Sequence, residues 1–291
     1  MASNKQYDMI TARFIESLER GVVPWHKPWQ TTTLNPINFT SKREYTGLLN
    51  IMLLNMSGYN APYWMTYKNA KKLGGQVKKG EKGSMVTFWT MFEGKEIQAN
   101  GKKKTIPFLK YYNLFNVEQC DGIKFEMPEQ VIMNPDFDPI ASADRIISGM
   151  PNKPTITHQE QRAYYSETSD KVNMPKKELF EKEAEYYGVL FHELTHSTLH
   201  PTRCNRNAGQ ERKAYALEEL VAEIGSSFLS AEAGIFNQTA DNSEAYIGSW
   251  IKALKNDSKM IVKASSMAQK ATKYILDIEA VETTEQSEKV A

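Results

Sequence analysis

The 291-residue sequence predicts a two-domain α+β fold, and three observations support this class. First, the chain is longer than one ordinary hydrophobic core usually organises. Second, residues 1–125 carry 18 Lys and Arg against 9 Asp and Glu, and the totals of 36 and 35 leave 18 against 26 for residues 126–291. Third, prolines gather where the sign of the charge changes. We therefore expect a basic domain followed by an acidic one.

The proline-rich stretch 127–154 is the expected junction. Proline disfavours helix in the residue before it, so Met127-Pro128, Asn134-Pro135 and Asp138-Pro139 indicate a linker, with one short helix from Ile140 to Met150. The predicted organisation is an N-terminal α+β domain over 1–126, this linker over 127–154, a C-terminal domain over 155–280 and a flexible polar tail over 281–291.

The N-terminal domain is expected to begin with a helix and to contain a hairpin. Met9, Ile10, Phe14, Ile15 and Leu18 recur on one side of a helix, which can pack on the sheet of this domain or present a partner surface, and we expect the packing. The segments 85–89 and 106–112 predict two strands. The lysine run 102–104 between them is typical of a solvated hairpin loop.

Aromatic residues also concentrate in this half, where 18 of the 31 Phe, Tyr and Trp lie within residues 1–125. Lysine and arginine attract phosphates through charge and counterion release, and exposed rings stack on unpaired bases. The combination predicts binding of single-stranded nucleic acid. The residues expected to make these contacts are Trp25, Lys27, Trp29, Lys42, Arg43, Tyr45, Trp64, Tyr67, Lys68, Lys78, Lys79 and Lys82.

Core packing is the competing interpretation for part of this set. A tryptophan in a domain of this size packs in the core more often than it stacks on a base. Trp64 and Trp89 both lie in patterns compatible with a core position. Sequence alone therefore leaves open which rings stack and which are buried.

The C-terminal half contains the run Phe191-His192-Glu193-Leu194-Thr195-His196, in a segment predicted to be helical from Pro175 until Pro201 limits it. Side chains four residues apart lie on one face of a helix, so His192 and His196 can hold one metal ion. Glu193 can then take a proton from metal-bound water. The run predicts a catalytic metal site.

Such a site needs a third protein ligand, because a catalytic zinc keeps three protein groups and one open position. His200 lies a helical rise of about 12 Å from His192, so we expect a helix-end side chain there and not a ligand. Glu219 and Glu223 lie together at the border of the apolar stripe of a later helix, 214–229, where carboxylates are scarce. A cation would compensate their partial burial.

This arrangement, His192-Glu193-x-x-His196 followed by Glu219-x-x-x-Glu223, resembles the metal site of gluzincin-type metallopeptidases. The resemblance implies a zincin-like C-terminal domain. It makes His192, His196 and Glu219 the ligands and Glu193 the general base. Glu223 becomes the acid that supports a ligand histidine.

Further residues are placed relative to this pattern. Glu218 is the alternative third ligand. Tyr215, one turn before Glu219, can offer its hydroxyl to a developing oxyanion or be an ordinary core or surface tyrosine. Two extended pieces around a polar turn within residues 163–175 imply a hairpin beside the cleft. His158, just upstream, is expected to be structural.

The motifs of the basic half resemble a known family as well. They are Val23-Pro24-Trp25-x-x-Pro28-Trp29, Tyr45-x-Gly47, Trp64-x-Thr66-Tyr67-Lys68-x-Ala70, Val77 to Gly83 and Tyr112 to Gln119. Together they are similar to the N-terminal single-stranded DNA-binding domain of ArdC-type antirestriction proteins. That family carries a C-terminal metallopeptidase domain, so the resemblance covers nearly the whole chain in the right order. One departure is the spacing of Gly47 and Asn50, which is one residue longer than expected.

The resemblance implies an antirestriction protein of a conjugative plasmid or mobile element, which binds single-stranded DNA and protects incoming DNA from host restriction. Two other hypotheses stay open. In one, DNA localises a zinc metalloprotease that cleaves a host protein, such as a restriction nuclease. In the other, the metal stabilises a protein-docking module without hydrolytic activity. Zn²⁺ is the expected cofactor, although two His and one carboxylate also suit Mn²⁺, Co²⁺ or Fe²⁺.

The remaining signals concern cellular location. Cys120 and Cys204 fall in different predicted domains and have no neighbours at metal-binding spacing, so no disulfide framework is expected. The N-terminus lacks an apolar signal core, and no apolar run approaches the roughly eighteen residues needed to span a bilayer. We therefore expect a cytoplasmic protein with no membrane partner.

Overall fold

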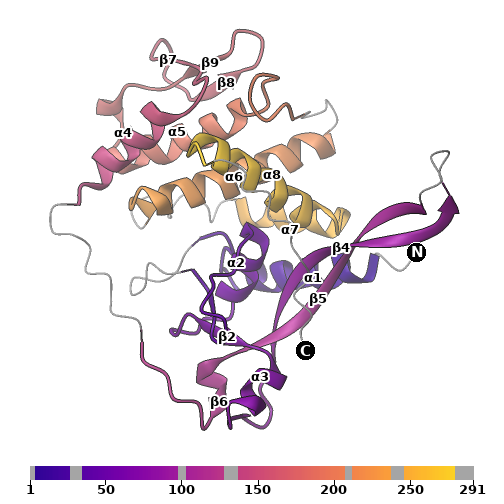
Figure 1. Cartoon of the computed structure of the whole chain (residues 1–291). Coiled ribbons are helices and arrows are strands. Elements are labelled where there is room, and N and C mark those ends of the chain that lie inside the picture. Colours follow the sequence, from indigo (N-terminus) through magenta and orange to yellow (C-terminus); the bar gives the residue numbers. More distant parts are fainter. Residues whose placement is uncertain are drawn as a thin grey trace. The chain divides into compact units, whose positions relative to one another are not determined.

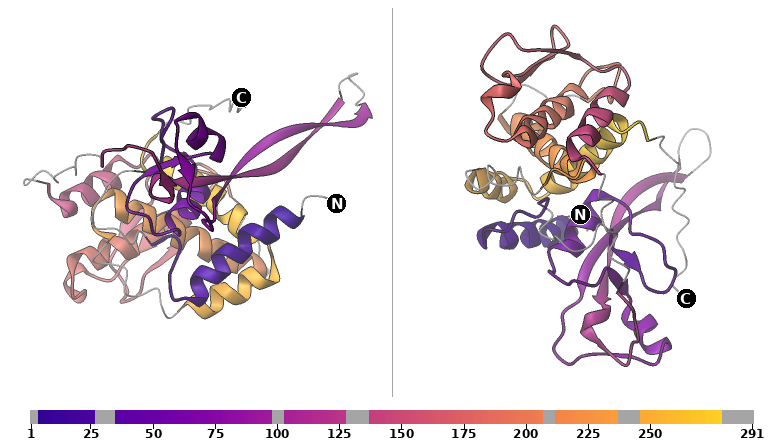
Figure 2. Two further views of the ribbon diagram at one scale, coloured as in Figure 1. Left: turned by 90° about the horizontal axis from the view of Figure 1, so that it is seen from below. Right: turned by 90° about the vertical axis from the view of Figure 1, so that its left-hand side faces the viewer.

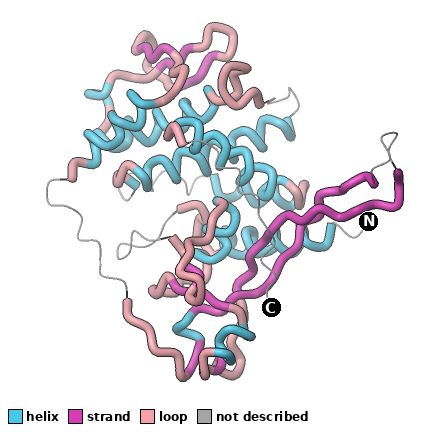
Figure 3. The backbone as a smooth tube through the Cα atoms, viewed as in Figure 1, coloured by secondary structure: helices cyan, strands magenta, loops and turns pink. Residues whose placement is uncertain are grey.

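The computed structural model describes residues 4–26, 35–97, 103–127, 137–206, 212–236 and 246–278, with the side chains of 91–97, 103–106 and 212 outside this description. These residues divide into two units, one of 4–13 and 35–127, the other of 14–26 and 137–278. Strands dominate the first unit and helices the second (Figure 3). The predicted α+β class with two domains is confirmed. Residues 14–26 belong to the second unit, whereas the sequence predicted them in the first.

The first unit is organised by a four-stranded sheet in the order β1-β2-β5-β4. The strands are β1 (Ile37–Asn38), β2 (Tyr63–Met65), β4 (Ser84–Ile97) and β5 (Lys103–Asn116). β4 and β5 pair antiparallel as a long twisted ribbon that extends away from the other strands (Figures 1 and 2). They contain both predicted strands. The turn that joins them, residues 98–102, lies outside the described residues.

Short elements pack around the base of this ribbon. They are α2 (Leu48–Asn55), α3 (Tyr67–Lys72), a pair of β3 (Gln76–Val77) with β6 (Cys120–Asp121), and the single turn η1 (Val117–Gln119). Leu54, Trp64, Val86 and Leu114 form one buried cluster there. The Asn50 side chain accepts a 2.8 Å hydrogen bond from the Thr87 N–H and donates one of 2.9 Å to the Thr87 C=O. Asn50 therefore takes the place of a neighbouring strand and holds α2 to β4.

The second unit has a small sheet and a layer of helices. The sheet order is β7 (Thr155–Thr157), β9 (Lys171–Asn173) and β8 (Tyr164–Ser166), and the last two form the predicted hairpin. The helices are α4 (Pro139–Gly149), α5 (Glu183–Ser197), α6 (Arg212–Glu232), α7 (Ile247–Asn256) and α8 (Met260–Ile275), preceded at α5 by a turn η2 (Lys177–Leu179).

Helix α5 begins later than the sequence predicts. The prediction of continuous helix from Pro175 is wrong because Phe180 and Lys182 adopt extended backbone, with ψ of 140° and 136°. Phe180 packs edge-on against Tyr186 with ring centroids 5.5 Å apart. An apolar contact thus overrides the helix propensity of this glutamate- and lysine-rich segment.

Helix α5 is the centre of the second core. Tyr187, Leu190, Phe191 and Leu194 are nearly or fully buried within one apolar cluster. Helix α6 packs closely on it, because a Cβ added at Gly225 would lie 2.7 Å from Thr195 Cγ2 and 2.8 Å from its Oγ1. The absence of a side chain at Gly225 permits this approach.

Residues 14–26 complete this unit. They include the last part of α1 (Asn4–Glu19) and the turn after it, where Gly21 has a φ of +75°. Trp25 is 2% exposed and packs edge-on against Trp250, with ring centroids 5.0 Å apart. His26 packs edge-on against Phe236, with ring centroids 5.3 Å apart. The last part of α1, from Phe14, is grouped with this unit by its contacts.

We predict that Gly225→Ala destabilises the second unit by about 1–3 kcal/mol, because the new methyl group overpacks against a buried β-branched side chain. Gly248→Ala is the matched control, since nothing lies within 4 Å of a Cβ there. That change should cost nothing or slightly stabilise α7. Urea denaturation of both variants measures the difference, and equal stabilities would contradict the close approach.

Candidate metal centre

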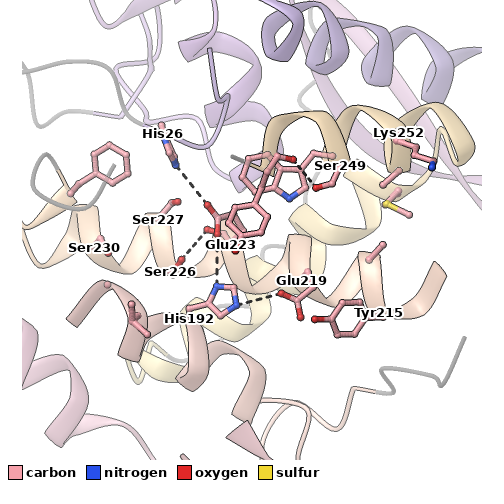
Figure 4. Close-up of a pocket in the computed structure, with 18 of the residues that line it drawn as sticks. His26, His192, Tyr215, Glu219, Glu223, Ser226, Ser227, Ser230, Ser249 and Lys252 are labelled. Carbon is pink, nitrogen blue, oxygen red and sulfur yellow. Dashed lines mark hydrogen bonds and ion pairs between the residues drawn. The ribbon is translucent and has the colours of Figure 1, made fainter. Parts of the chain in front are cut away.

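The structure brings His192, His196 and Glu219 together. The two histidines lie one turn apart on α5, with their Nε2 atoms 3.1 Å from each other. Glu219 comes from α6, with Oε2 3.7 Å from His192 Nε2 and Oε1 3.6 Å from His196 Nε2. Figure 4 shows His192 and Glu219 facing each other. Ligand atoms of all three residues lie within 4.8 Å of one another.

This donor set fits a divalent metal ion. Three ligands in tetrahedral geometry with bonds of 2.0–2.2 Å place their donor atoms about 3.4 Å apart. The two Nε2 atoms lie 3.1 Å apart, each has a Glu219 oxygen at 3.6 or 3.7 Å, and one ligand atom from each of the three residues lies within 4.8 Å of the others, which is close to that spacing. Two neutral imidazoles and one carboxylate leave an open position for water or substrate. A metal centre with His192, His196 and Glu219 as ligands is what the geometry favours.

Two pKa shifts reflect the charge balance of this donor set. Burial acts to lower the pKa of His192, but the contact with Glu219 and the charges of Glu193 and Glu223 raise it above its ordinary value. Burial acts to raise the pKa of Glu219, yet the contact with His192 and the charges of the two imidazoles hold it below its usual range. The carboxylates therefore favour a positive charge at the centre.

Glu193 is placed to act beside the centre. It is 8% exposed, and burial raises the pKa of its carboxyl group above the ordinary value. A hydrogen bond with the backbone of Tyr165 on β8 acts in the opposite direction. A carboxylate with a raised pKa is a stronger base than an exposed one, which suits Glu193 to accept a proton.

Two carboxylates face the outer nitrogens of the ligand histidines. Glu218 Oε1 lies 3.1 Å from His196 Nδ1, and Glu223 Oε2 lies 3.8 Å from His192 Nδ1. A carboxylate at Nδ1 favours the tautomer that leaves the Nε2 lone pair free for a metal. The placement of Glu223 agrees with the supporting role predicted for it. Glu218 lies on the Nδ1 side of His196, away from the Nε2 atoms, which argues against its use as the alternative ligand.

A cavity of about 950 Å³ opens beside the centre. It is lined by His192, Glu219 and Glu223, by aromatic residues that include Phe236 and Trp250, and by His26. His26 Nε2 lies 3.8 Å from Glu223 Oε1 (Figure 4). Sequence reasoning did not find His26 here, because no spacing rule connects it with residues almost 200 positions later.

The other histidines and Tyr215 lie as follows. His158 Nε2 lies 3.1 Å from the Tyr186 hydroxyl, a structural contact. His200 follows the end of α5 and contacts Thr202, away from the ligand set. Tyr215 is 65% exposed, and the charge of Glu219 together with their hydrogen bond raises the pKa of its phenol. Tyr215 therefore lines the cavity next to Glu219, the proposed third metal ligand, as Figure 4 shows.

The residues predicted to bind nucleic acid divide into four groups. Lys27 and Trp29 lie outside the described residues. Trp25 and Trp64 are 2% and 3% exposed, so neither ring can stack on a base, and this correction follows from core packing. Tyr45 is half-buried and accepts a hydrogen bond from Asn38. The exposed members are Lys42, Arg43, Tyr67, Lys68, Lys78, Lys79 and Lys82.

Two exposed rings on the β4–β5 ribbon were not in that set. Trp89 is 47% and Tyr111 39% exposed. The register pairs Thr87 with Tyr111 and Trp89 with Leu109, so both rings lie on one face as diagonal neighbours. The sequence left a core position open for Trp89, because alternation alone does not say which face of a ribbon is covered.

Comparison with known proteins decides the family. A model of the N-terminal domain of anti-restriction factor ArdC matches residues 4–115, and one of a zincin-like metallopeptidase matches residues 141–267. The metal-free crystal structure of antirestriction protein ArdC from plasmid R388 superposes with a TM-score of 0.69 at 39% identity. The alignment covers 93% of this chain and 96% of that one. The chain belongs to the ArdC family of antirestriction proteins.

Other relatives extend this comparison. The Mn(II)-bound R388 ArdC structure aligns with a TM-score of 0.70 at 38% identity, over 93% of this chain and 97% of that one. Protein y4eC of Sinorhizobium fredii is 30% identical over 92% of this chain and 91% of its own length. Two DNA primases TraC of Escherichia coli are 35% and 33% identical over 97% and 96% of this chain. The ArdC-family chain spans only 28% and 20% of those primases.

The chain therefore has an ArdC N-terminal domain and a zincin-like metallopeptidase domain, as the motifs predicted. The Mn(II)-bound relative and the donor set described above together support a divalent metal. Among the described residues, no helix is long and apolar enough to cross a membrane.

We predict that Trp25→Ala destabilises the second unit by about 3–5 kcal/mol, because it removes a buried ring from its contact with Trp250. Affinity for single-stranded DNA should stay within about twofold of the parent protein. Urea denaturation and fluorescence anisotropy with a labelled oligonucleotide measure the two effects. If Trp25→Ala lowered DNA affinity and left stability unchanged, Trp25 would contact DNA after all, which would contradict its burial in the core.

Proposed function

We propose that this ArdC-family protein binds single-stranded DNA through its first unit, protects incoming DNA from host restriction, and carries a zinc-dependent peptidase centre in its second unit. The observation that carries the enzymatic part is the convergence of two imidazoles and a carboxylate with the buried acid Glu193 beside them. The proposed setting is the cytoplasm of a cell that receives a conjugative plasmid or mobile element.

Residues of this chain divide the hydrolytic work among them. A bound divalent ion supplies Lewis-acid chemistry, which polarises a carbonyl and makes water acidic. Glu193 would take the proton from the attacking water and deliver it to the leaving amine. Glu218 would orient the His196 ring through its Nδ1 atom, and Glu223 would orient the His192 ring in the same way. Tyr215 would offer its hydroxyl at the cavity to the developing oxyanion.

Support for the DNA-binding part comes from the surface of the first unit. Exposed lysines occur on α3 and on the glycine-rich turn before β4, where Lys78, Lys79 and Lys82 follow one another closely. Tyr67, Trp89 and Tyr111 are exposed rings of the same unit. Cations for phosphates and rings for unpaired bases are the two requirements of single-strand binding.

A second candidate function makes peptide cleavage primary. In it, DNA localises the protein and the second unit cleaves a host protein bound nearby. The cavity of about 950 Å³ beside the donor set favours this candidate, because a space of this size can hold part of a bound peptide. In a third possibility, the metal stabilises a docking module, and hydrolysis plays no part.

We predict that Glu193→Gln keeps metal affinity and stability but lowers peptide hydrolysis by at least about a hundredfold, because the proton acceptor is lost. The measurements are metal titration, thermal melting and cleavage of a fluorogenic peptide library. Plasmid transfer into a restricting host separates the candidates. If the variant protects incoming DNA fully, DNA binding is sufficient for protection. If protection is lost while DNA binding is intact, the protease candidate is supported.

We predict that Trp89→Ala weakens binding to oligo-dT by about 5- to 150-fold, since a stacked base contributes roughly 1–3 kcal/mol. Tyr246→Ala is the matched control, because Tyr246 is an exposed ring of the second unit, 60% exposed. Anisotropy titrations at several salt concentrations measure affinity and the salt slope. Equal affinities for single strand and duplex, without a salt slope, would contradict the proposal.

A further inference from the structure

Glu218 has no place in the ligand set, yet it is one of the most buried acids of the second unit. It is 6% exposed and lies in the second turn of α6, directly before the ligand Glu219. Its Oε1 atom is 3.1 Å from His196 Nδ1. Since His196 Nε2 points to the other donors, Glu218 contacts this ring on the side opposite the proposed metal.

A single arginine compensates the Glu218 carboxylate. Arg206 lies in the loop between α5 and α6, and its side chain is 5% exposed. Nη1 of Arg206 donates to Glu218 Oε2, and Nη2 donates to Glu218 Oε1 at 3.0 Å. This two-pronged pairing fixes the carboxylate in position and in plane, which one point charge cannot do.

The same guanidinium also holds the end of the active-site helix. Nη2 of Arg206 donates to the Thr195 C=O at 2.9 Å and to Thr198 Oγ1 at 2.8 Å. Thr195 lies directly before the ligand His196. Arg206 therefore connects the backbone next to one ligand with the acid that contacts the ring of that ligand.

We propose that Arg206 is a positioning residue of the metal centre, which acts on His196 through Glu218. It keeps Glu218 oriented so that His196 Nδ1 donates to it and His196 Nε2 presents its lone pair to the ion. This inference rests on the proposed metal centre and adds to it a residue from outside the motif.

The competing explanation is a purely structural arginine, and Arg203 provides the comparison. The Arg203 side chain is 1% exposed and pairs with both oxygens of Asp170 at 2.8 Å. It also donates to the carbonyls of Ser197 and Asn152, each at 2.9 Å. Arg203 thus has the same burial and chemistry in the same loop, and none of these bonds reaches a ligand imidazole.

The test compares Arg206→Met, Arg206→Lys, Glu218→Gln and Arg203→Met in the full-length protein. Zn²⁺ affinity is measured by competition with a chromophoric chelator, and stability by urea denaturation. The visible spectrum of the Co²⁺-loaded protein reports on ligand geometry. His192→Ala serves as the reference for a destroyed site.

The expected result is a 10- to 100-fold loss of Zn²⁺ affinity and an altered Co²⁺ spectrum in Arg206→Met and Glu218→Gln. Arg206→Lys should recover part of the affinity. Arg203→Met should bind Zn²⁺ within about threefold of the parent protein, even where its stability falls further. If Arg206→Met does not fold, Arg206→Lys replaces it as the test variant. A loss of Zn²⁺ affinity of about tenfold in Arg206→Lys then supports the proposal.

Unchanged affinity in Glu218→Gln or in the folded Arg206 variants would overturn the positioning role. Equal losses in Arg206→Met and Arg203→Met would overturn it too, since they would indicate general loosening of the loop. A parent protein that binds no divalent ion would instead overturn the metal centre itself, so the two failures are distinguishable.

Discussion

The close packing of α6 on α5 is the constraint on which the site depends. Gly225 lets α6 approach the fully buried Thr195, so that Glu219 from one helix lies 3.6–3.7 Å from the imidazole nitrogens of the other. Because metal–ligand bonds vary by only a few tenths of an ångström, a shift of about 1 Å between these helices would remove the third donor. The packing of the second core therefore determines where the third donor lies relative to the two imidazoles.

Charge balance is the second requirement of the centre. Four carboxylates, those of Glu193, Glu218, Glu219 and Glu223, surround two imidazoles within a largely buried space. Such a concentration of acids is stable only with compensating cations. Arg206 compensates Glu218. A divalent ion would complete the balance, which gives a physical reason for metal binding that is independent of family membership.

Much of the fold and of the site was predictable from sequence. The HExxH spacing predicts His192, Glu193 and His196 on neighbouring turns because helical geometry is local, and the apolar stripe of α6 points to Glu219 and Glu223. The structure brings Glu219 to the two histidines. The position of Glu218 at His196 Nδ1, where it cannot serve as the alternative third ligand, was not predictable from sequence. It depends on which ring nitrogen each acid faces. Trp25 was predicted as a DNA contact and is buried, and Trp89 was left open and is exposed, since composition reports that rings are present and not which surface covers them. The membership of residues 14–26 in the second unit depends on contacts between distant parts of the chain, such as Trp25 with Trp250.

The most direct test of the central claim is X-ray absorption spectroscopy of the Zn²⁺-loaded protein. The account predicts two imidazole nitrogens and at least one carboxylate oxygen at about 2.0–2.2 Å, with a remaining light-atom ligand from solvent. The same spectrum of Glu219→Ala should lose the carboxylate contribution while both imidazoles remain. Sulfur scattering at about 2.3 Å, or a spectrum without imidazole scattering, would contradict the centre described here.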